Sequence, residues 1–335
     1  MKISDVATFD PELETAVEAG KARVRQILKA IRMKRSLNDK VVALKGKLME
    51  FRTTSNGMDI QSDGVKSEEL NITGGKDNRK LKIRVYKPES DNDNLPCIYH
   101  IHGGGMIVGS IEEDIAQMSV ISKIFHTAVV DVDYRLAPEF PYPTGMEDCY
   151  DGLVWVSHHA KDLHIDPSRI GLLGESAGGG LAAAITIKAR DNGGPKVLFN
   201  ALLAPMLDDR NSTPSSRLCK GAWPSWPREL NILAWYALLG DNAGSRNVPP
   251  YASPAHARDL RGLPPTYIEV GELEVFRDED IIYANRLMNS GVPVELHVYP
   301  GTFHSSYNVA PKAAISKRTV KNRMDWISTQ ICRRF

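Results

Sequence analysis

The chain has 335 residues, of which 42% are hydrophobic, 25% charged and 7% aromatic. These proportions are typical of a globular protein and exclude a largely disordered or collagen-like chain. The 42 lysines and arginines nearly balance the 41 aspartates and glutamates, so the net charge is only +1. Because nucleic-acid-binding surfaces need a marked basic excess, this balance argues against a nucleic-acid partner.

The cysteines and the apolar runs indicate the environment of the protein. Cys97, Cys149, Cys219 and Cys332 lie far apart, and no two of them form a C-x-x-C pair. We therefore expect reduced, mostly packed thiols, with no disulfide framework and no cysteine zinc site. The first residues lack the apolar stretch of a secretory signal, and no apolar run is long enough to span a bilayer. These features predict a cytoplasmic protein without stable membrane insertion.

Residues 1–50 predict a helical segment that covers the main domain. Asp10-Pro11 is a typical helix start, because aspartate accepts hydrogen bonds from free amides and proline suits the first turn. Apolar residues then recur at helical spacing as far as Ile31. The opposite face is basic, so docking on a membrane surface is the alternative to a solvated face.

Residues 51–335 predict one α/β domain. A strand-like stretch lies within 65–88, and short apolar strands then alternate with helices. The further strands are expected at 97–102, 128–133, 169–174, 198–204, 266–270 and 294–299, and the helices at 146–159, 177–190, 278–289 and 313–331. Apolar strands separated by helices favour a mainly parallel sheet that is covered on both faces.

Residues 208–250 interrupt this alternation. The segment is rich in proline and tryptophan around one short predicted helix, 229–239, and it lies between two strands, so we interpret it as a cap insertion. Two interpretations of its tryptophans remain open: they pack the cap onto the core, or they line a substrate pocket. In the second case the pocket residues are Trp223 and Trp226, together with Met206.

The strongest local motif is G-x-S-x-G at Gly174-Glu175-Ser176-Ala177-Gly178. Chance alone supplies such a motif in some chains of this length, but here a strand precedes it and a helix follows it. A serine at that junction occupies a sharp turn that projects its hydroxyl, and the glycines avoid collisions with neighbouring backbone. The helix N-terminus also favours a developing negative charge. Ser176 is therefore the candidate nucleophile.

A second motif, His102-Gly103-Gly104-Gly105, directly follows a predicted strand. Glycines let backbone amides approach a ligand closely, so Gly103, Gly104 and the amide of Ala177 are candidates for an oxyanion hole. The alternatives are a flexible turn or a phosphate loop. A phosphate loop would continue with lysine and serine or threonine, whereas Met106-Ile107 follows.

A serine hydroxyl needs a base, so the histidines after Ser176 are the candidates. His256 lies in a proline-containing loop and His297 alternates within an apolar strand, whereas His304 lies in the loop that leaves the last strand. The loop after the preceding strand, 271–280, offers five carboxylates for the orienting acid. The chain order of serine, acid and histidine is that of the α/β-hydrolases.

Taken together, the motifs resemble those of the hormone-sensitive-lipase family of α/β-hydrolases. Besides the H-G-G-G loop and the G-E-S-A-G-G turn, the matches are Asp133-Tyr134-Arg135-Leu136-Ala137-Pro138-Glu139, Met206-Leu207-Asp208-Asp209-Arg210 and Pro300-Gly301-x-x-His304. The resemblance implies an α/β-hydrolase fold and a serine carboxylesterase. It also implies a cap made of N-terminal helices and the insertion, and no metal or other cofactor; no metal-ligand spacing is evident either.

The chain departs from the family pattern at two positions. The family commonly writes its acid within D-x-L-x-D-E, and alignment on Arg277-Asp278-Glu279 places Glu274 at the position of the aspartate. A glutamate can accept the same hydrogen bond, so Glu274 is the predicted acid, with Glu272 and Asp278 as rivals. Glu175 replaces the usual aspartate beside the serine, and we interpret it as structural support for the turn.

The expected activity is hydrolysis of short- to medium-chain acyl esters through an acyl-enzyme intermediate. A heavily charged N-terminal helix is unlike the apolar lid of a long-chain lipase. The alternatives are a lactonase or specialised esterase of a secondary metabolite, and a non-catalytic receptor. Plant gibberellin receptors resemble this family but have lost the catalytic histidine, whereas Ser176, an acid and His304 are all present here. A homodimer is expected by analogy with the family.

Overall fold

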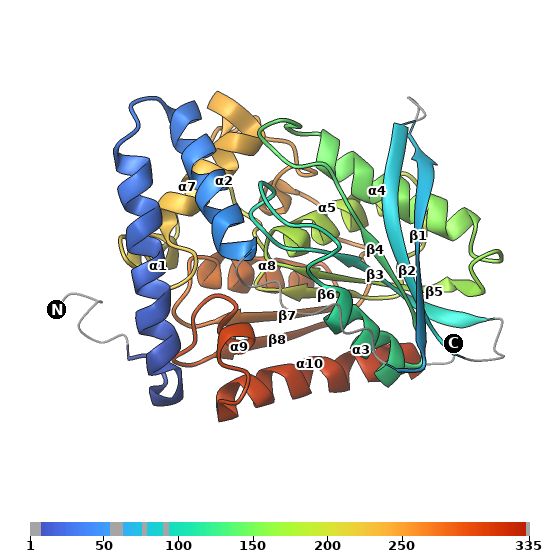
Figure 1. Ribbon diagram of the computed structural model, residues 1–335. Coiled ribbons are helices and arrows are strands. Elements are labelled where there is room, and N and C mark those ends of the chain that lie inside the picture. Colours follow the sequence, from blue (N-terminus) through green and yellow to red (C-terminus); the bar gives the residue numbers. More distant parts are fainter. Residues whose placement is uncertain (1–7, 54–62, 76–78, 90–93, 333–335) are drawn as a thin grey trace.

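The computed structural model describes residues 8–53, 63–75, 79–89 and 94–332. One twisted eight-stranded sheet crosses the molecule, with helices on both faces (Figure 1). The strands are β1 (Val65–Gly74), β2 (Arg79–Pro88), β3 (Leu95–Ile101), β4 (Ala128–Val132), β5 (Ile165–Glu175), β6 (Asn200–Leu203), β7 (Thr266–Gly271) and β8 (Val294–Tyr299).

The strand order is β1-β2-β4-β3-β5-β6-β7-β8. The β1–β2 and β2–β4 pairs are antiparallel, and the remaining neighbours pair in parallel. Every residue of β3, β4, β6 and β7 is buried, as expected of strands that are covered on both faces. The predicted mainly parallel α/β sheet is confirmed.

The helices surround this sheet in two layers. They are α1 (Glu14–Arg32), α2 (Leu37–Thr53), α3 (Ile115–Phe125), α4 (Thr144–His158), α5 (Ala177–Asp191), α6 (Pro214–Leu218), α7 (Arg228–Leu239), α8 (Arg277–Asn289), α9 (Ser306–Val309) and α10 (Ala314–Cys332). One apolar core joins α4, α5 and α8 to one face of the sheet, and a second joins α3 and α10 to the other. Single 3-10 turns lie at Pro11–Leu13, Gly240–Asn242 and Pro254–His256.

The N-terminal region contains two helices, whereas the sequence pattern predicted one. The start at Asp10 is confirmed, because its side chain accepts from the amide of Glu12 at 2.9 Å. The second helix, α2, begins after Ser36, whose hydroxyl oxygen accepts from the amide of Asp39 at 3.1 Å. That capping serine was the available signal for α2. Helix α3 was also missed, since eleven mostly apolar residues between two strands do not show a clear helical period.

The N-terminal helices pack against the inserted segment. Helix α1 contacts α2, and α2 contacts α7, at one end of the sheet (Figure 1). The chain ahead of α1 also contacts the loop after β8, since the amide of Asp10 donates to the carbonyl of Gly301 at 3.0 Å. The ring of Phe9 lies 5.5 Å from that of Trp223 and 6.1 Å from that of Phe303. Phe9 and Asp10 therefore contact and support the loop that carries His304.

All four cysteines are free thiols; three are buried and Cys332 is exposed. Within the described ranges, no helix combines the length and apolar character that crossing a membrane requires.

Candidate active site

Ser176 occupies the turn between β5 and α5, with φ 56° and ψ −116°. A positive φ is strained for a residue with a side chain, and such strain persists only where the surroundings enforce it. Here the surroundings require glycine on both sides of the serine. A Cβ on Gly178 would lie 2.0 Å from the carbonyl oxygen of Ile101, and one on Gly174 would lie 2.3 Å from that of Gly178. The motif glycines thus permit the close packing that holds the serine in this conformation.

The structure brings Ser176, His304 and Glu274 together in one hydrogen-bonded series. Nε2 of His304 lies 3.0 Å from Oγ of Ser176, and Nδ1 lies 3.2 Å from Oε1 of Glu274. The second carboxylate oxygen of Glu274 accepts from the amide of Gly271 at 3.0 Å, which fixes the carboxylate. With Nδ1 donating to Glu274, Nε2 is free to accept the serine proton. All three side chains are buried.

The two rival acids are engaged elsewhere. One oxygen of Glu272 accepts from the amide of Gly301 at 2.9 Å. Asp278 accepts from the amide of Ser215 at 2.7 Å and from Nε of Arg277 at 2.8 Å. Neither carboxylate is bonded to His304, so the geometry favours Glu274 over both rivals.

The glycine loop after β3 lies directly against the serine turn. A Cβ on Gly103 would lie 3.0 Å from the carbonyl oxygen of Glu175 and 3.5 Å from Cβ of Ser176. Gly104 has φ +124°, and a Cβ there would lie 1.9 Å from the carbonyl oxygen of Val108. Ala177, the third oxyanion candidate, is the first residue of α5. Gly103 and Ala177 therefore lie beside the nucleophile, and Gly104 is the next residue of the same loop.

His102 holds the glycine loop in place as a neutral ring. Burial lowers the pKa of His102 to about 3, so the ring carries no charge near neutral pH. Its Nδ1 donates to the carbonyl of Gly103 at 2.8 Å. The ring also stacks on Tyr134 at 4.2 Å, and the hydroxyl of Tyr134 donates to the carbonyl of His102 at 3.0 Å.

Two further carboxylates form hydrogen bonds that connect segments around the site. Oε1 of Glu175 accepts from the hydroxyl of Ser305 at 2.8 Å and from Nδ2 of Asn308 at 3.2 Å, which links the serine turn to the histidine loop. Oε1 of Glu279 accepts from the amides of Leu207 and Asp208 at 2.8 and 3.0 Å. Burial raises the pKa of Glu279 well above its usual range. From the sequence, Glu279 was expected only to favour the start of a helix, as one of the acids at 278–280, so its contacts with Leu207 and Asp208 were missed.

The three residues predicted to bind substrate occupy different environments. Trp226 is buried against the glycine loop, since a Cβ on Gly105 would lie 2.6 Å from its ring. Trp223 is partly exposed, and its Nε1 donates to the carbonyl of Leu273 at 2.8 Å. The side chain of Met206 is fully buried, and its amide donates to the carbonyl of Ser176 at 2.9 Å. Met206 thus supports the serine turn and exposes no surface in this conformation.

A small, mostly apolar pocket of about 10 Å³ lies beside the glycine loop. Its wall is formed by Met106, which follows the glycine loop, by residues of α4, α5 and α7, and by residues of the segments 134–142 and 251–252. The lining residues include Met106, Tyr142, Met146, Leu181, Leu238 and Tyr251. Sequence reasoning missed this pocket because its wall is assembled from segments that are far apart in the chain.

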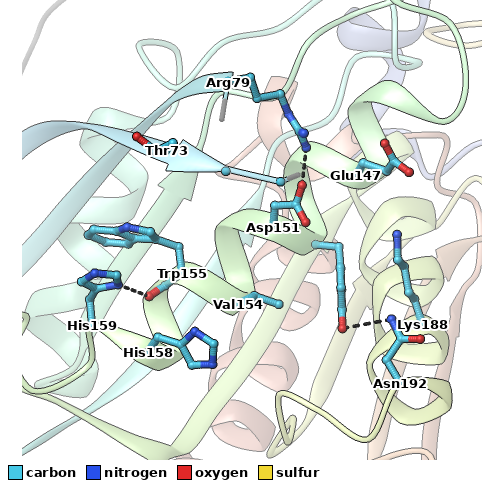
Figure 2. A pocket seen from close by; sticks show the side chains of 13 residues that line it. Thr73, Arg79, Glu147, Asp151, Val154, Trp155, His158, His159, Lys188 and Asn192 are labelled. Atoms are coloured by element: carbon cyan, nitrogen blue, oxygen red, sulfur yellow. Dashed lines mark hydrogen bonds and ion pairs between the residues drawn. The ribbon is translucent and has the colours of Figure 1, made fainter. Parts of the chain in front are cut away.

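A larger cavity of about 690 Å³ lies at the opposite end of α5 (Figure 2). Lys188 lines it, and a rise of 1.5 Å per residue places Lys188 about 18 Å along the helix from Ser176. Figure 2 shows Arg79 directed at Asp151, and Arg79 also donates to Asp148 at 2.6 Å. Because this cavity is remote from Ser176, we assign it no part in the reaction at that residue.

Comparisons with known proteins place the chain among esterases of the alpha/beta hydrolase fold. A family model described as the alpha/beta hydrolase fold matches residues 98–308. Carboxylesterase NlhH of Mycobacterium tuberculosis is 39% identical over 241 residues, which cover 70% of this chain and 74% of that protein. An arylesterase of Saccharolobus solfataricus is 36% identical over 230 residues, covering 68% and 72% of the two chains.

The similar solved structures are also esterases. A structure of a bacterial heroin esterase superposes with a TM-score of 0.84 at 36% identity, covering 97% of this chain and 99% of that one. A structure of esterase LipW from Mycobacterium marinum gives a TM-score of 0.78 at 30% identity, covering 88% and 91%. The chain therefore belongs to the α/β-hydrolase fold family, as a member resembling the hormone-sensitive-lipase-like esterases.

Proposed function

We propose that this protein hydrolyses short- to medium-chain acyl esters, with Ser176 as the nucleophile, His304 as the base and Glu274 as the orienting acid. The chain is a carboxylic-ester hydrolase, and esterase activity is named for its relatives at 35–39% identity. The observation that carries the residue assignment is the hydrogen-bonded series from Ser176 through His304 to Glu274.

The geometry supports a two-step reaction. Oγ of Ser176 attacks the acyl carbon while Nε2 of His304 takes the hydroxyl proton, and Glu274 stabilises the imidazolium that forms. The tetrahedral intermediate collapses, the C–O bond to the alcohol breaks, and His304 returns its proton to the departing oxygen. A water molecule then gives a proton to His304 and attacks the acyl-enzyme. Collapse of the second intermediate, with the proton returned to Oγ, releases the acid and restores Ser176.

The oxyanion of each tetrahedral intermediate is proposed to accept from the amides of Gly103, Gly104 and Ala177. Donors that are fixed before the reaction lower the barrier because they need no reorganisation as charge develops. Supporting this role, the glycine loop packs against the serine turn, and neutral His102 fixes the carbonyl of Gly103.

We further propose that residues 1–50 and 208–250 form the cap and that the apolar pocket beside the glycine loop takes the acyl chain. An apolar wall that includes Met106, Leu181 and Leu238 suits a hydrocarbon chain. Because the pocket of about 10 Å³ has room for about one water molecule, its side chains must move apart to admit even a short acyl chain. Trp226 contributes to this region through its contact with Gly105. Cytoplasmic location, a homodimeric state and lactone hydrolysis stay predictions of the sequence.

The test is hydrolysis of p-nitrophenyl esters from acetate to palmitate. We expect kcat/KM to peak at short or medium chains. Leu238→Ala removes a buried side chain from the pocket wall and should raise kcat/KM for longer esters relative to acetate by about tenfold, since each methylene that fits is worth about 1–3 kcal/mol. The matched control is Ile232→Ala, at an exposed position of the same helix. A peak at palmitate, or an unchanged profile in Leu238→Ala, would contradict the proposed acyl pocket.

A further inference from the structure

Three potential metal-binding side chains lie close together, and two of them flank the segment that carries the glycine loop. They are His100 on β3, Asp131 on β4 and Asp114 at the start of α3. One ligand atom from each lies within 4.8 Å of the others. His100 and Asp131 are direct partners in the β3–β4 register, so their side chains extend from the same face of the sheet.

This cluster contains a polar atom without a hydrogen-bond partner. Oδ1 of Asp131 lies 3.0 Å from Nδ1 of His100, but Oδ2 of Asp131 has no hydrogen-bond donor in the part of the chain that the structure describes. Asp131 is fully buried, so an unsatisfied carboxylate oxygen there is costly. Against the effect of burial, Asp131 raises the pKa of His100 to about 9, so His100 is the cation bonded to Oδ1. Arg84, the register partner of Asp131 on β2, is bonded to Glu69.

A second cluster of the same composition provides a contrast. Asp208, Asp209 and His256 also bring three ligand atoms within 4.8 Å of one another. There, however, Asp208 accepts twice from the guanidinium of Arg210, at 2.7 and 2.8 Å, and once from its amide at 3.0 Å. Asp209 accepts from His256 at 2.8 Å and from the amide of Gly244 at 2.6 Å. Protein donors already satisfy these carboxylates, so this cluster has no comparable need for a cation.

We propose that His100, Asp114 and Asp131 form a binding site for one divalent first-row metal ion, best matched by Zn²⁺. One imidazole nitrogen and two carboxylate oxygens are ligands that Zn²⁺ accepts, at about 2.0–2.2 Å, with a water molecule in the fourth position. Donor atoms within 4.8 Å of one another need side-chain adjustments but no strand movement to reach such distances. Binding displaces the proton that His100 donates to Asp131, and the two carboxylates balance the charge of the ion.

The position of the site gives the ion a structural role. His100 immediately precedes the end of β3, and Asp114 immediately precedes α3, so both ends of the intervening segment 101–113 contribute a ligand. That segment contains Gly103 and Gly104. An ion bound to His100 and Asp114 would close this segment into a loop and limit its motion, and Asp131 would fix the ion to the neighbouring strand.

The test is Zn²⁺ binding to the full-length, chelator-treated protein by isothermal titration calorimetry. Wild type should bind one Zn²⁺ at this site, and Asp131→Asn, which preserves the side-chain shape, should weaken that binding by about 100-fold. Asp209→Asn, at the second His–Asp cluster, is the matched control and should bind Zn²⁺ as wild type does. A hundredfold excess of Zn²⁺ over Kd should raise the Tm of wild type by about 4 °C and that of Asp131→Asn much less.

Circular dichroism checks that Asp131→Asn is folded, and Asp114→Asn replaces it if it is not. Co²⁺ provides a readout on wild type alone, because a low-symmetry nitrogen and oxygen site gives it an intense visible absorption that a hydrated ion lacks. No stoichiometric binding by wild type would overturn the proposal. Equal binding by wild type, Asp131→Asn and Asp114→Asn would indicate an adventitious ion only and would overturn the proposal too. So would loss of Zn²⁺ binding in Asp209→Asn. None of these results depends on ester hydrolysis.

Discussion

Replacing His304 with alanine is expected to lower kcat for p-nitrophenyl acetate by about 10⁴-fold or more. Nε2 of His304 is the group bonded to Oγ of Ser176, so its loss leaves the hydroxyl without a base. Because members of a triad act as a unit, the double variant Ser176→Ala/His304→Ala should be scarcely less active than either single variant. Steady-state kinetics of the three variants measures both effects. The protein concentration is determined by absorbance, which does not depend on an active serine.

The matched control for His304 is His297→Ala. His297 lies on β8, is partly exposed and is bonded to Glu295 at 2.8 Å. We expect its kcat to stay within a few-fold of wild type. If His304→Ala retained a tenth or more of wild-type kcat, or if the losses in the single variants multiplied in the double variant, His304 and Ser176 would not function as proposed.

The second large effect is expected at the acid. Glu274→Gln should lower kcat by about 10³–10⁴-fold while changing stability little. The glutamine can still accept the hydrogen bond from the amide of Gly271, but it removes the negative charge that stabilises the imidazolium of His304. An amide can also present its NH₂ group to Nδ1, and that arrangement would favour the wrong tautomer of the histidine.

Glu272→Gln provides the comparison for Glu274→Gln. Glu272 lies in the same loop and accepts from the amide of Gly301, so its substitution perturbs the histidine loop without touching the imidazole. Its kcat should fall by less than tenfold. A larger loss in Glu272→Gln than in Glu274→Gln would transfer the role of the acid to Glu272.

The serine turn was predictable from the sequence because its determinants are local. The glycines around Ser176 are required by contacts shorter than 3 Å, and a strand and a helix flank them in sequence. Parallel strands were predictable for the same reason, since their apolar runs and intervening helices are continuous in the chain. The N-terminal break before α2 was missed because one capping serine is a weak signal.

The remaining parts of the site depend on distant contacts. Spacing alone offered several carboxylates between 271 and 280, and resemblance to the family, rather than the residues themselves, singled out Glu274. The acyl pocket draws on Met106, Leu181 and Leu238, which no sequence period connects. His100 and Asp131 are neighbours only through the pairing of β3 with β4, so sequence spacing did not indicate a ligand cluster there.

The central claim, that Ser176 is the nucleophile, is tested most directly by covalent labelling with diethyl p-nitrophenyl phosphate. Attack by Oγ on phosphorus would form a serine phosphoester and expel p-nitrophenolate, with the serine proton passing to His304. Intact-protein and peptide mass spectrometry should find one diethylphosphoryl group per chain, on Ser176, together with complete loss of esterase activity. Ser176→Ala should stay unlabelled. A label on another residue that inactivates the enzyme, or full activity in a protein labelled at Ser176, would contradict the account.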